Sequence, residues 1–318
     1  MATLDTLKNC GIVPVVVLDN VKDAVPTAQA MLRGGVNVME ITLRTAAGLD
    51  SIKEVAQSCP EICVGGGTVL TLPQCRAAVA AGAKFIVSPG FDRPLVEWCV
   101  ENRVDVTPGC VTPTEITEAL SLGINVVKFF PANVYGGLSA MKALAAPFGK
   151  VKFIPTGGVS EKNLAEYMGV PYIYAVGGSW LCAKEDISAG NFEKITALCR
   201  EARKIALGFE FAHLGINCVD ASASMDVCKR FDDAFGFGIK EGNSSNFASS
   251  GIEVMKEQYL GANGHIAIRT ADIGRAVACL EEKGYQVDPD TAKYKGNAMI
   301  AIYLKQEFGG FAVHLLQK

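Results

Sequence analysis

The sequence of 318 residues has no long hydrophobic run and no excess of basic residues. A membrane-spanning helix needs about 20 consecutive apolar residues, and every apolar run here is shorter. The formal net charge is −3, with 30 Lys and Arg against 33 Asp and Glu. Without a basic surface, binding to nucleic acid is not expected. These absences predict an ordinary soluble protein.

The sequence also lacks a secretion signal and paired cysteines. The N-terminal segment has no basic region before its short apolar stretch and carries Asp5. The 11 cysteines include no C-x-x-C pair, and an odd number without a signal argues for reduced thiols. Cys59 and Cys63, the closest pair, are interpreted as small buried residues. The sequence therefore predicts a cytoplasmic protein.

Short apolar runs alternate with helical patterns in the first two thirds of the chain. The runs cover residues 12–18, 36–43, 62–67, 84–90, 104–109, 125–131, 152–158 and 172–178. Several follow a helix that ends in glycine, which stops a helix because it adopts a left-handed conformation without a Cβ clash. Apolar strands between helices imply a parallel sheet covered on both faces. Eight such units predict a closed (β/α)8 TIM barrel, with a doubly wound open sheet as the alternative.

The pattern changes after Gly208. An apolar segment at 211–218 is followed by a helical pattern and three β-like segments, and the same order starts again at 264–270. This is a weak repeat of about 50 residues with the order β-α-β-β-β. We predict a barrel domain over residues 1–207 and a smaller α+β domain of paired βαβββ modules over 208–318.

One lysine lies inside an apolar run, in the segment VVKFFP. Alternate residues of a barrel strand point inward, so Lys128 and Phe130 share one face. Among apolar walls near the C-terminal mouth of a barrel, a lysine tends to be a neutral nucleophile that can form an imine with a ketone. The alternative is a lysine that reaches the rim or pairs with a carboxylate.

The second predicted strand, in VMEITLRT, carries a carboxylate and a guanidinium on one face. Glu40 could be the acid/base partner of an imine mechanism. Arg44, at the end of the strand, could bind a substrate carboxylate with two hydrogen bonds. The alternative is a buried structural pair between Glu40 and Arg44.

Three glycine-rich turns follow predicted strands: GGGT at 65–68, TGGV at 156–159 and GGSW at 177–180. The last two follow strands seven and eight, whose loops bind phosphate in many barrels through backbone N–H groups. Tight turns need glycine in any case, so each turn alone carries little weight. Together they predict a phosphate site.

The motifs MEITLRT, GGGTVL, SPG, VVKFFPA, PTGG and GGSWL occur in an order that resembles the 2-keto-3-deoxy-6-phosphogluconate (KDPG) / 4-hydroxy-2-oxoglutarate (KHG) aldolase family, over residues 1 to about 207. The resemblance implies a class I aldolase that releases pyruvate and an aldehyde without a metal, and a homotrimer. It implies Lys128 as the Schiff-base lysine and Glu40 as the acid/base. The substrate-binding positions that it implies are Arg44, Thr68, Pro89, Phe130, Thr156, Gly157, Gly158, Gly178 and Ser179.

All three histidines lie after residue 208. The segment resembles the vicinal oxygen chelate (glyoxalase-like) superfamily, in which paired βαβββ modules hold a divalent metal. The ligands that this resemblance implies are His213, Glu253, His265 and His314. His314 is a departure, because glyoxalases have a catalytic glutamate there. Three imidazoles and one carboxylate suit zinc, nickel or iron. A metal-free binding or assembly module is the alternative.

Two other functions remain open for the barrel. One is a non-catalytic sensor of keto acids or sugar phosphates. The other is a phosphosugar isomerase, which would use a carboxylate base without an imine. An inward lysine and an inward glutamate favour the aldolase, because a sensor needs neither of them.

Overall fold

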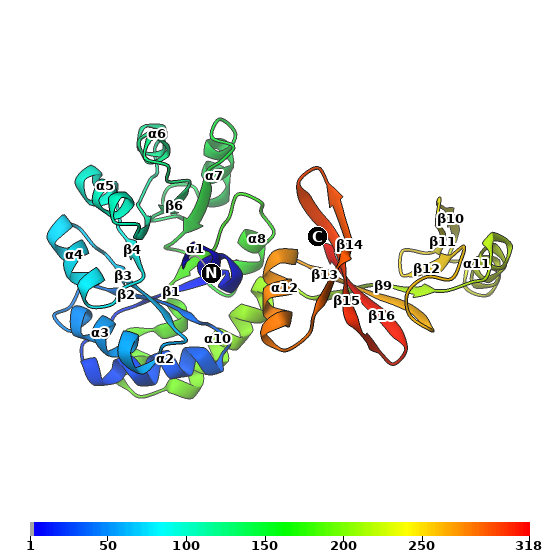
Figure 1. The fold of residues 1–318 in the computed structure, drawn as a ribbon, viewed down its shortest axis with the longest axis horizontal. Coiled ribbons are helices and arrows are strands. Elements are labelled where there is room, and N and C mark those ends of the chain that lie inside the picture. The colour runs from blue at the N-terminus through cyan, green and yellow to red at the C-terminus, as the bar shows by residue number, and fades with distance from the viewer. Residues whose placement is uncertain (1–2) are drawn as a thin grey trace. The chain divides into compact units, whose positions relative to one another are not determined.

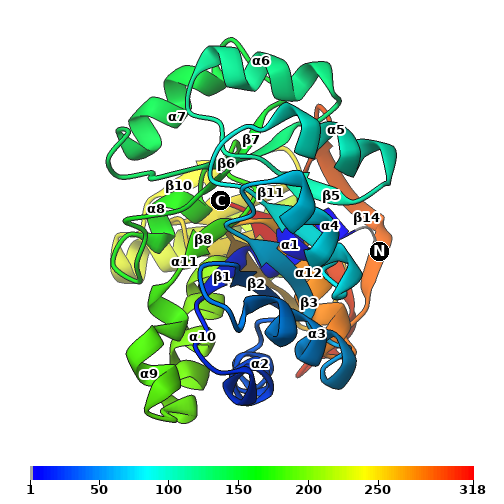
Figure 2. The same cartoon turned by 90° about the vertical axis from the view of Figure 1, so that its left-hand side faces the viewer.

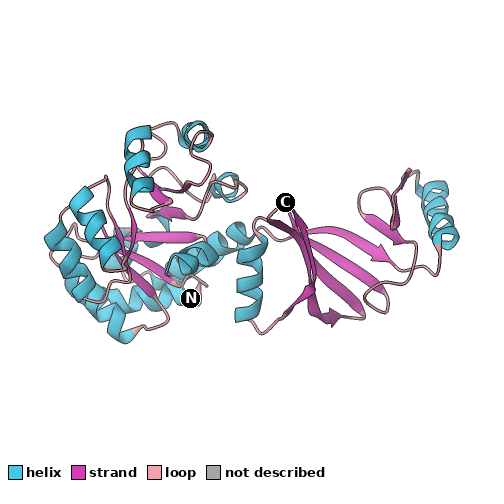
Figure 3. Cartoon of the chain, turned by 45° about the horizontal axis from the view of Figure 1, so that its top comes forward, coloured by secondary structure: helices cyan, strands magenta, loops and turns pink. Residues whose placement is uncertain are grey.

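The computed structural model describes residues 3–318. The chain forms two compact units, one ending at Ala206 and the other spanning Leu207–Lys318 (Figure 1). In the first unit, helices surround a set of short strands; the second unit is built on one large sheet (Figure 3). Within residues 3–318, no helix is long and apolar enough to cross a membrane.

The first unit contains the eight predicted strands, all parallel. They are β1 (Ile12–Val16), β2 (Val38–Thr42), β3 (Cys63–Gly67), β4 (Phe85–Val87), β5 (Asp105–Thr107), β6 (Val126–Phe129), β7 (Lys152–Pro155) and β8 (Val176–Gly178). Six of them form a sheet in the order β5-β4-β3-β2-β1-β8, and β6 pairs with β7. Single bridges, Gly109 to Lys128 and Thr156 to Gly177, join the two sheets. The strands therefore close into a TIM-like barrel, and the open-sheet alternative is wrong.

Helices cover the outside of this barrel (Figure 2). They are α1 (Thr3–Cys10), α2 (Ala24–Arg33), α3 (Gly48–Ser58), α4 (Leu72–Ala80), α5 (Arg93–Glu101), α6 (Pro113–Ser121), α7 (Gly137–Ala145), α8 (Leu164–Met168), α9 (Lys184–Ser188) and α10 (Phe192–Leu207). Their starts have a chemical cause. Thr112 and Glu115 form a reciprocal capping box at α6, and a proline occupies the first turn of α4, α5 and α6.

The second unit contains two halves with the same order of elements. The first half is β9 (Glu210–Ile216), α11 (Ala221–Phe235), β10 (Ile239–Glu241), β11 (Ser245–Ala248) and β12 (Ile252–Met255). The second is β13 (Gly264–Thr270), α12 (Ile273–Glu282), β14 (Val287–Lys295), β15 (Ala298–Phe308) and β16 (Phe311–Gln317). They share one mixed sheet in the order β10-β11-β12-β9-β13-β16-β15-β14, with β9 antiparallel to β13 at its centre.

Each helix of the second unit packs on the same face of this sheet. Cys228 of α11 packs with Val254 of β12, and Ala276 of α12 packs with Leu315 of β16. Strand residues alternate between faces. The neighbours of these apolar residues, among them His314, therefore point to the opposite face, which the two helices leave open.

Candidate functional site

Lys128 of β6 and Glu40 of β2 form a buried ion pair inside the barrel. The Lys128 Nζ lies 3.3 Å from Glu40 Oε1, and the two residues are 5% and 2% exposed. Strands β2 and β6 are four strands apart in either direction around the barrel. Because the pair spans the interior, both side chains point inward. The alternative of a buried Glu40–Arg44 pair is wrong, since Glu40 pairs with the lysine.

A glycine makes room for the carboxylate. A Cβ atom at Gly67, the last residue of β3, would overlap the side chain of Glu40. Gly65 of the same run is required for another reason, because the ring of Phe85 occupies the place of its Cβ. The GGG run thus lets the Phe85 ring and the Glu40 carboxylate fill the barrel. The sequence alone did not indicate this role of Gly67.

Phe130 also contacts the amine. The Lys128 Nζ lies 5.4 Å from the centroid of the Phe130 ring. The amine therefore has a carboxylate and an aromatic ring as its neighbours. Transfer of one proton from Lys128 to Glu40 gives a neutral amine beside a carboxylic acid, which is the state that can attack a ketone.

Polar groups gather at the C-terminal ends of β2, β3 and β7. The exposed Arg44 donates from Nε to Thr68 Oγ1 at 3.1 Å. Thr68 has a φ of 53°, an uncommon conformation for a β-branched residue. The buried Thr156 hydroxyl has no hydrogen-bond partner among residues 3–318. Pro89 is half-buried after β4. A guanidinium, two hydroxyls and a buried amine together suit a 2-oxo acid.

The turns after β7 and β8 lie at the same end of the barrel. Gly157 and Gly158 have φ values of 90° and 84°, which favour glycine. A Cβ at Gly178 would overlap the ring of Trp180, and Ser179 is exposed beside it. These turns, like Arg44, Thr68 and Thr156, lie at the C-terminal ends of parallel strands, where barrels of this type bind their ligands.

Known proteins match this part of the chain. The family model for KDPG and KHG aldolase matches residues 4–198. The 2-dehydro-3-deoxy-phosphogluconate aldolase of Treponema pallidum is 45% identical over 201 residues, which are 63% of this chain and 96% of that protein. The chain belongs to the KDPG and KHG aldolase family. It is a class I aldolase, a carbon–carbon lyase that acts through a Schiff base without a metal.

Two further aldolases of this family are similar to the chain. The KHG/KDPG aldolase of Escherichia coli K12 is 41% identical over 191 residues, 60% of this chain and 90% of that one. A structure of KDPG aldolase from Legionella pneumophila, with pyruvate captured as a covalent carbinolamine, has a TM-score of 0.62 and 37% identity. It covers 64% of this chain and 98% of that chain. The family match ends before the second unit.

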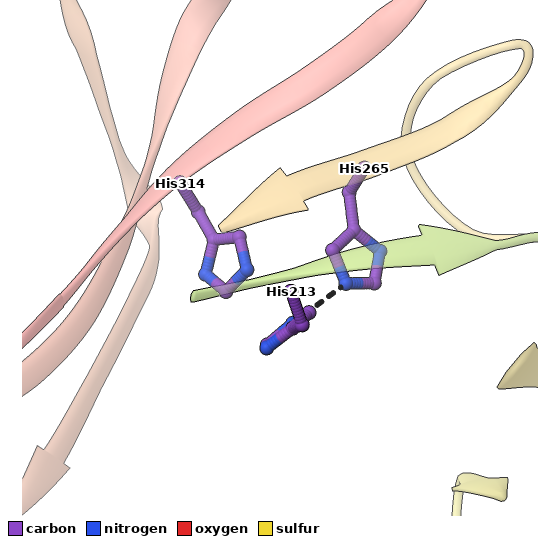
Figure 4. A group of neighbouring side chains, drawn as sticks. All are labelled: His213, His265 and His314. Carbon is purple, nitrogen blue, oxygen red and sulfur yellow. Dashed lines mark hydrogen bonds between the residues drawn. The ribbon is translucent and has the colours of Figure 1, made fainter. Parts of the chain in front are cut away.

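The second unit brings its three histidines together. His213 lies on β9, His265 on β13 and His314 on β16, and one ring nitrogen from each lies within 4.8 Å of the others. Their rings point toward a common space (Figure 4). The Nε2 atoms of His213 and His265 are 3.2 Å apart. Gly215 is needed beneath them, because a Cβ there would overlap the His265 ring.

Glu253 of β12 completes this group, which we call the histidine cluster (His213, Glu253, His265 and His314). Its Oε2 lies 3.0 Å from His213 Nε2 and 3.2 Å from His265 Nε2, and Ser245 donates to Oε1 at 2.6 Å. Burial alone would raise the pKa of Glu253, but the hydrogen bonds from His213, His265 and Ser245 outweigh it and lower this pKa well below the usual range. The carboxylate is therefore ionised at neutral pH.

His314 is buried without a hydrogen bond. Neither of its ring nitrogens has a partner among residues 3–318, and Tyr303 stacks on the ring at 4.5 Å between centroids. Burial and the neighbouring His265 and His213 lower the pKa of His314 to about 3, so its lone pair is free at neutral pH. A buried polar group without a partner is costly. The metal-free alternative expects ordinary hydrogen bonds at each histidine; His213 and His265 have them, and His314 has none among residues 3–318.

The three histidines could hold a metal ion, and three members of the cluster have distances that can be compared with those of a metal site. Four ligands about 2.0–2.1 Å from a zinc ion at the corners of a tetrahedron lie about 3.3 Å from one another. The three contacts among His213, His265 and Glu253 are 3.0–3.2 Å, close to that spacing. Neutral imidazoles and a carboxylate are also the donors that zinc, nickel and iron accept.

Proposed function

We propose that the barrel cleaves KDPG to pyruvate and glyceraldehyde 3-phosphate, and 4-hydroxy-2-oxoglutarate to pyruvate and glyoxylate, with Lys128 as the Schiff-base lysine and Glu40 as the acid/base. The observation that supports these roles is the 3.3 Å contact between two buried side chains from opposite sides of the barrel. A buried amine next to one carboxylate provides both groups that an imine mechanism needs.

The steps follow from this pair. Lys128 gives a proton to Glu40 and attacks the C2 ketone to form a carbinolamine. Glu40 returns this proton to the carbinolamine hydroxyl, which leaves as water, and an iminium forms. Glu40, then a carboxylate, removes the proton of the C4 hydroxyl. The C3–C4 bond breaks, its electron pair moves into the iminium, and the aldehyde leaves. Protonation of the resulting enamine at C3 and hydrolysis release pyruvate and the free lysine.

Binding roles follow from the same geometry. Arg44, Thr68 and Thr156 hold the substrate carboxylate through a guanidinium and two hydroxyls. Pro89 and Phe130 are apolar walls near the amine. The turns that follow β7 and β8 hold the distal phosphate, and their residues are Gly157, Gly158, Gly178 and Ser179.

Borohydride trapping tests this assignment. Reduction in the presence of pyruvate should add one reduced pyruvyl group per chain, and peptide mass mapping should place it on Lys128. Lys128→Ala should abolish cleavage, and Lys128→Arg should be equally inactive because a guanidinium remains protonated. Label on another lysine would contradict the mechanism. A sensor or a phosphosugar isomerase would take up no label at all.

We also propose that the second unit, residues 208–318, is a glyoxalase-like domain whose histidine cluster binds zinc, nickel or iron. The unpartnered His314 and the ligand-like spacing of His213, His265 and Glu253 support this role. A glyoxalase reaction does not follow, because His314 stands where those enzymes have a glutamate base. Metal analysis of the purified protein tests the proposal.

Assembly and location complete the proposal. We infer a cytoplasmic homotrimer from the family resemblance and from the reduced cysteines that the sequence indicates. Light scattering of the purified protein should give about three times the chain mass of 33.7 kDa. A monomer in that measurement would contradict the trimer without affecting the chemistry of the barrel.

A further inference from the structure

A cleft of about 510 Å³ opens on the histidine face of the second unit. One proposed metal ligand, His213, forms part of its wall. The rest of the wall includes two aromatic rings, two cations and the serines of the turn between β11 and β12. The rings and cations are Phe237, Phe247, Lys240 and Arg269.

The register of the strands explains why these side chains share one space. Lys240 pairs with Phe247, and Phe247 pairs with Glu253 of the histidine cluster. Antiparallel partners point to the same face of a sheet. Arg269 lies four residues after His265 on β13, and an even spacing also keeps the same face. The cations therefore belong to the face that carries the cluster.

Both cations are unpaired. Within residues 3–318, neither Lys240 nor Arg269 forms an ion pair. The acid opposite Arg269 in the ladder is Glu210, and it is bonded by Lys318 at 2.6 Å. The cleft thus presents two free positive charges beside apolar rings, which is a pattern that recognises the charged end and the carbon body of an organic anion.

We propose that this cleft binds a small organic oxyanion, a carboxylate or a phosphate. Lys240 and Arg269 hold the charged group, and Phe237 and Phe247 pack against the carbon body. The part of the bound anion that lies toward His213 places an oxygen on the metal. Only this contact depends on the proposed metal centre. The substrates and products of a KDPG and KHG aldolase belong to this chemical class, so the ligand can be a metabolite that the barrel itself uses or makes.

The test uses phenylglyoxal, which modifies accessible arginines, on the full chain. Peptide mass spectrometry measures the rate at each arginine with oxalate or inorganic phosphate as probes, in chelator-treated and in zinc-loaded protein. We expect one or both probes to slow modification of Arg269 and not of Arg230, an exposed arginine on α11. Protection by oxalate alone identifies a carboxylate ligand, and protection by phosphate alone identifies a phosphate ligand.

A matched pair of lysine variants tests the second cation. Lys240→Ala should raise the half-protecting concentration about tenfold, the scale of one charge-assisted hydrogen bond. Lys240→Arg should keep most of the protection, and Lys229→Ala, at an exposed position of α11, should change nothing. A half-protecting concentration that is the same in Lys240→Ala and in the chain without this substitution would overturn the proposal.

The two proposals fail separately. Protection that depends on Lys240 in a protein that takes up no zinc supports the anion site and contradicts the metal centre. Zinc uptake without protection of Arg269 by either probe overturns the anion site and supports the metal centre. Protection in the chelator-treated protein that strengthens on zinc loading supports both.

Discussion

Lys128 and Glu40 compensate each other's charge, in addition to the chemical roles proposed for them. Each is almost fully buried, and each has the other as its ion-pair partner. Removing one member of a buried pair leaves the other charge without compensation, which costs about 3–5 kcal/mol. Substitution of Lys128 or Glu40 should therefore lower both the aldolase activity and the stability of the barrel. Activity and stability can be measured separately.

Glu40→Gln should lower kcat by about 10²–10⁴-fold, the usual scale for loss of a positioned acid/base. The amide keeps the size of the side chain but cannot accept the C4 hydroxyl proton. Steady-state kinetics with KDPG would measure the change, and borohydride trapping with pyruvate would report whether the imine still forms. Normal turnover in this variant would mean that another group carries the proton.

A double-mutant cycle measures the pairing itself. Lys128→Met should lower the free energy of unfolding by about 3–5 kcal/mol, because it leaves the Glu40 carboxylate buried alone. Adding Glu40→Gln to that variant should recover part of the loss, since a neutral amide costs less to bury than a charge. Denaturant unfolding of the four proteins provides the values. Additive losses would contradict an energetic coupling between the two side chains.

At the scale of elements, the barrel strands were predictable because each is a short apolar run between helices. The ends of the strands were less predictable. The run at 172–178 becomes β8 only from Val176, and Ile173 contributes a single bridge to Phe153. Parity predicted that Lys128 and Glu40 point inward. It could not show that they meet, because contact across a barrel depends on closure and strand stagger.

The role of Gly67 could not be predicted from the sequence, which assigned Gly65–Gly67 to a turn, whereas all three glycines belong to β3. Gly67→Ala should push the Glu40 carboxylate out of place and lower kcat about 10²-fold. Gly169→Ala is the control, because its Cβ would meet nothing closer than 3.9 Å. Equal activity of both variants would show that Glu40 tolerates the shift.

The turns after β7 and β8 give a separate prediction. Inorganic phosphate should compete with KDPG and much less with 4-hydroxy-2-oxoglutarate, because only the first substrate fills the phosphate site. Inhibition constants measured against both substrates would test it. Equal inhibition of the two reactions would indicate that these turns bind no phosphate.

At the scale of the whole molecule, the repeat in the second unit was visible as two similar runs of segments. Its cleft was not, because Lys240 and Arg269 look like any solvated charges until the strand register places them on one face. The spacing of the histidine cluster has the same origin. Four residues from β9, β12, β13 and β16 converge only because β9 and β13 pair at the centre of the sheet.

The two units should be chemically separable. The family match ends at residue 198, and the 201 residues that align with the Treponema relative cover 96% of that protein. A chain that ends at Leu207 should therefore keep its aldolase activity, and a chelator should not inhibit cleavage by the full protein. His213→Ala with His265→Ala should remove bound metal and leave cleavage near normal. Loss of activity on truncation would mean that the second unit supports the barrel, and metal retained in the double variant would mean that the ligands are elsewhere.

The closure of the barrel has a consequence for its motions. Strands β6 and β7 pair with each other over four residues. One isolated bridge joins Lys128 to Gly109 on the β5 side, and two join Phe153 and Thr156 to Ile173 and Gly177 on the β8 side. The lysine thus lies on a two-strand ribbon that can separate from the barrel with the loss of few hydrogen bonds. In hydrogen–deuterium exchange, amides at these two junctions should exchange earlier than those between β2 and β3, whose ladder runs over five residues. Pyruvate trapped on Lys128 should slow exchange of the amides at these two junctions. The covalent intermediate would then stabilise the closed barrel during turnover.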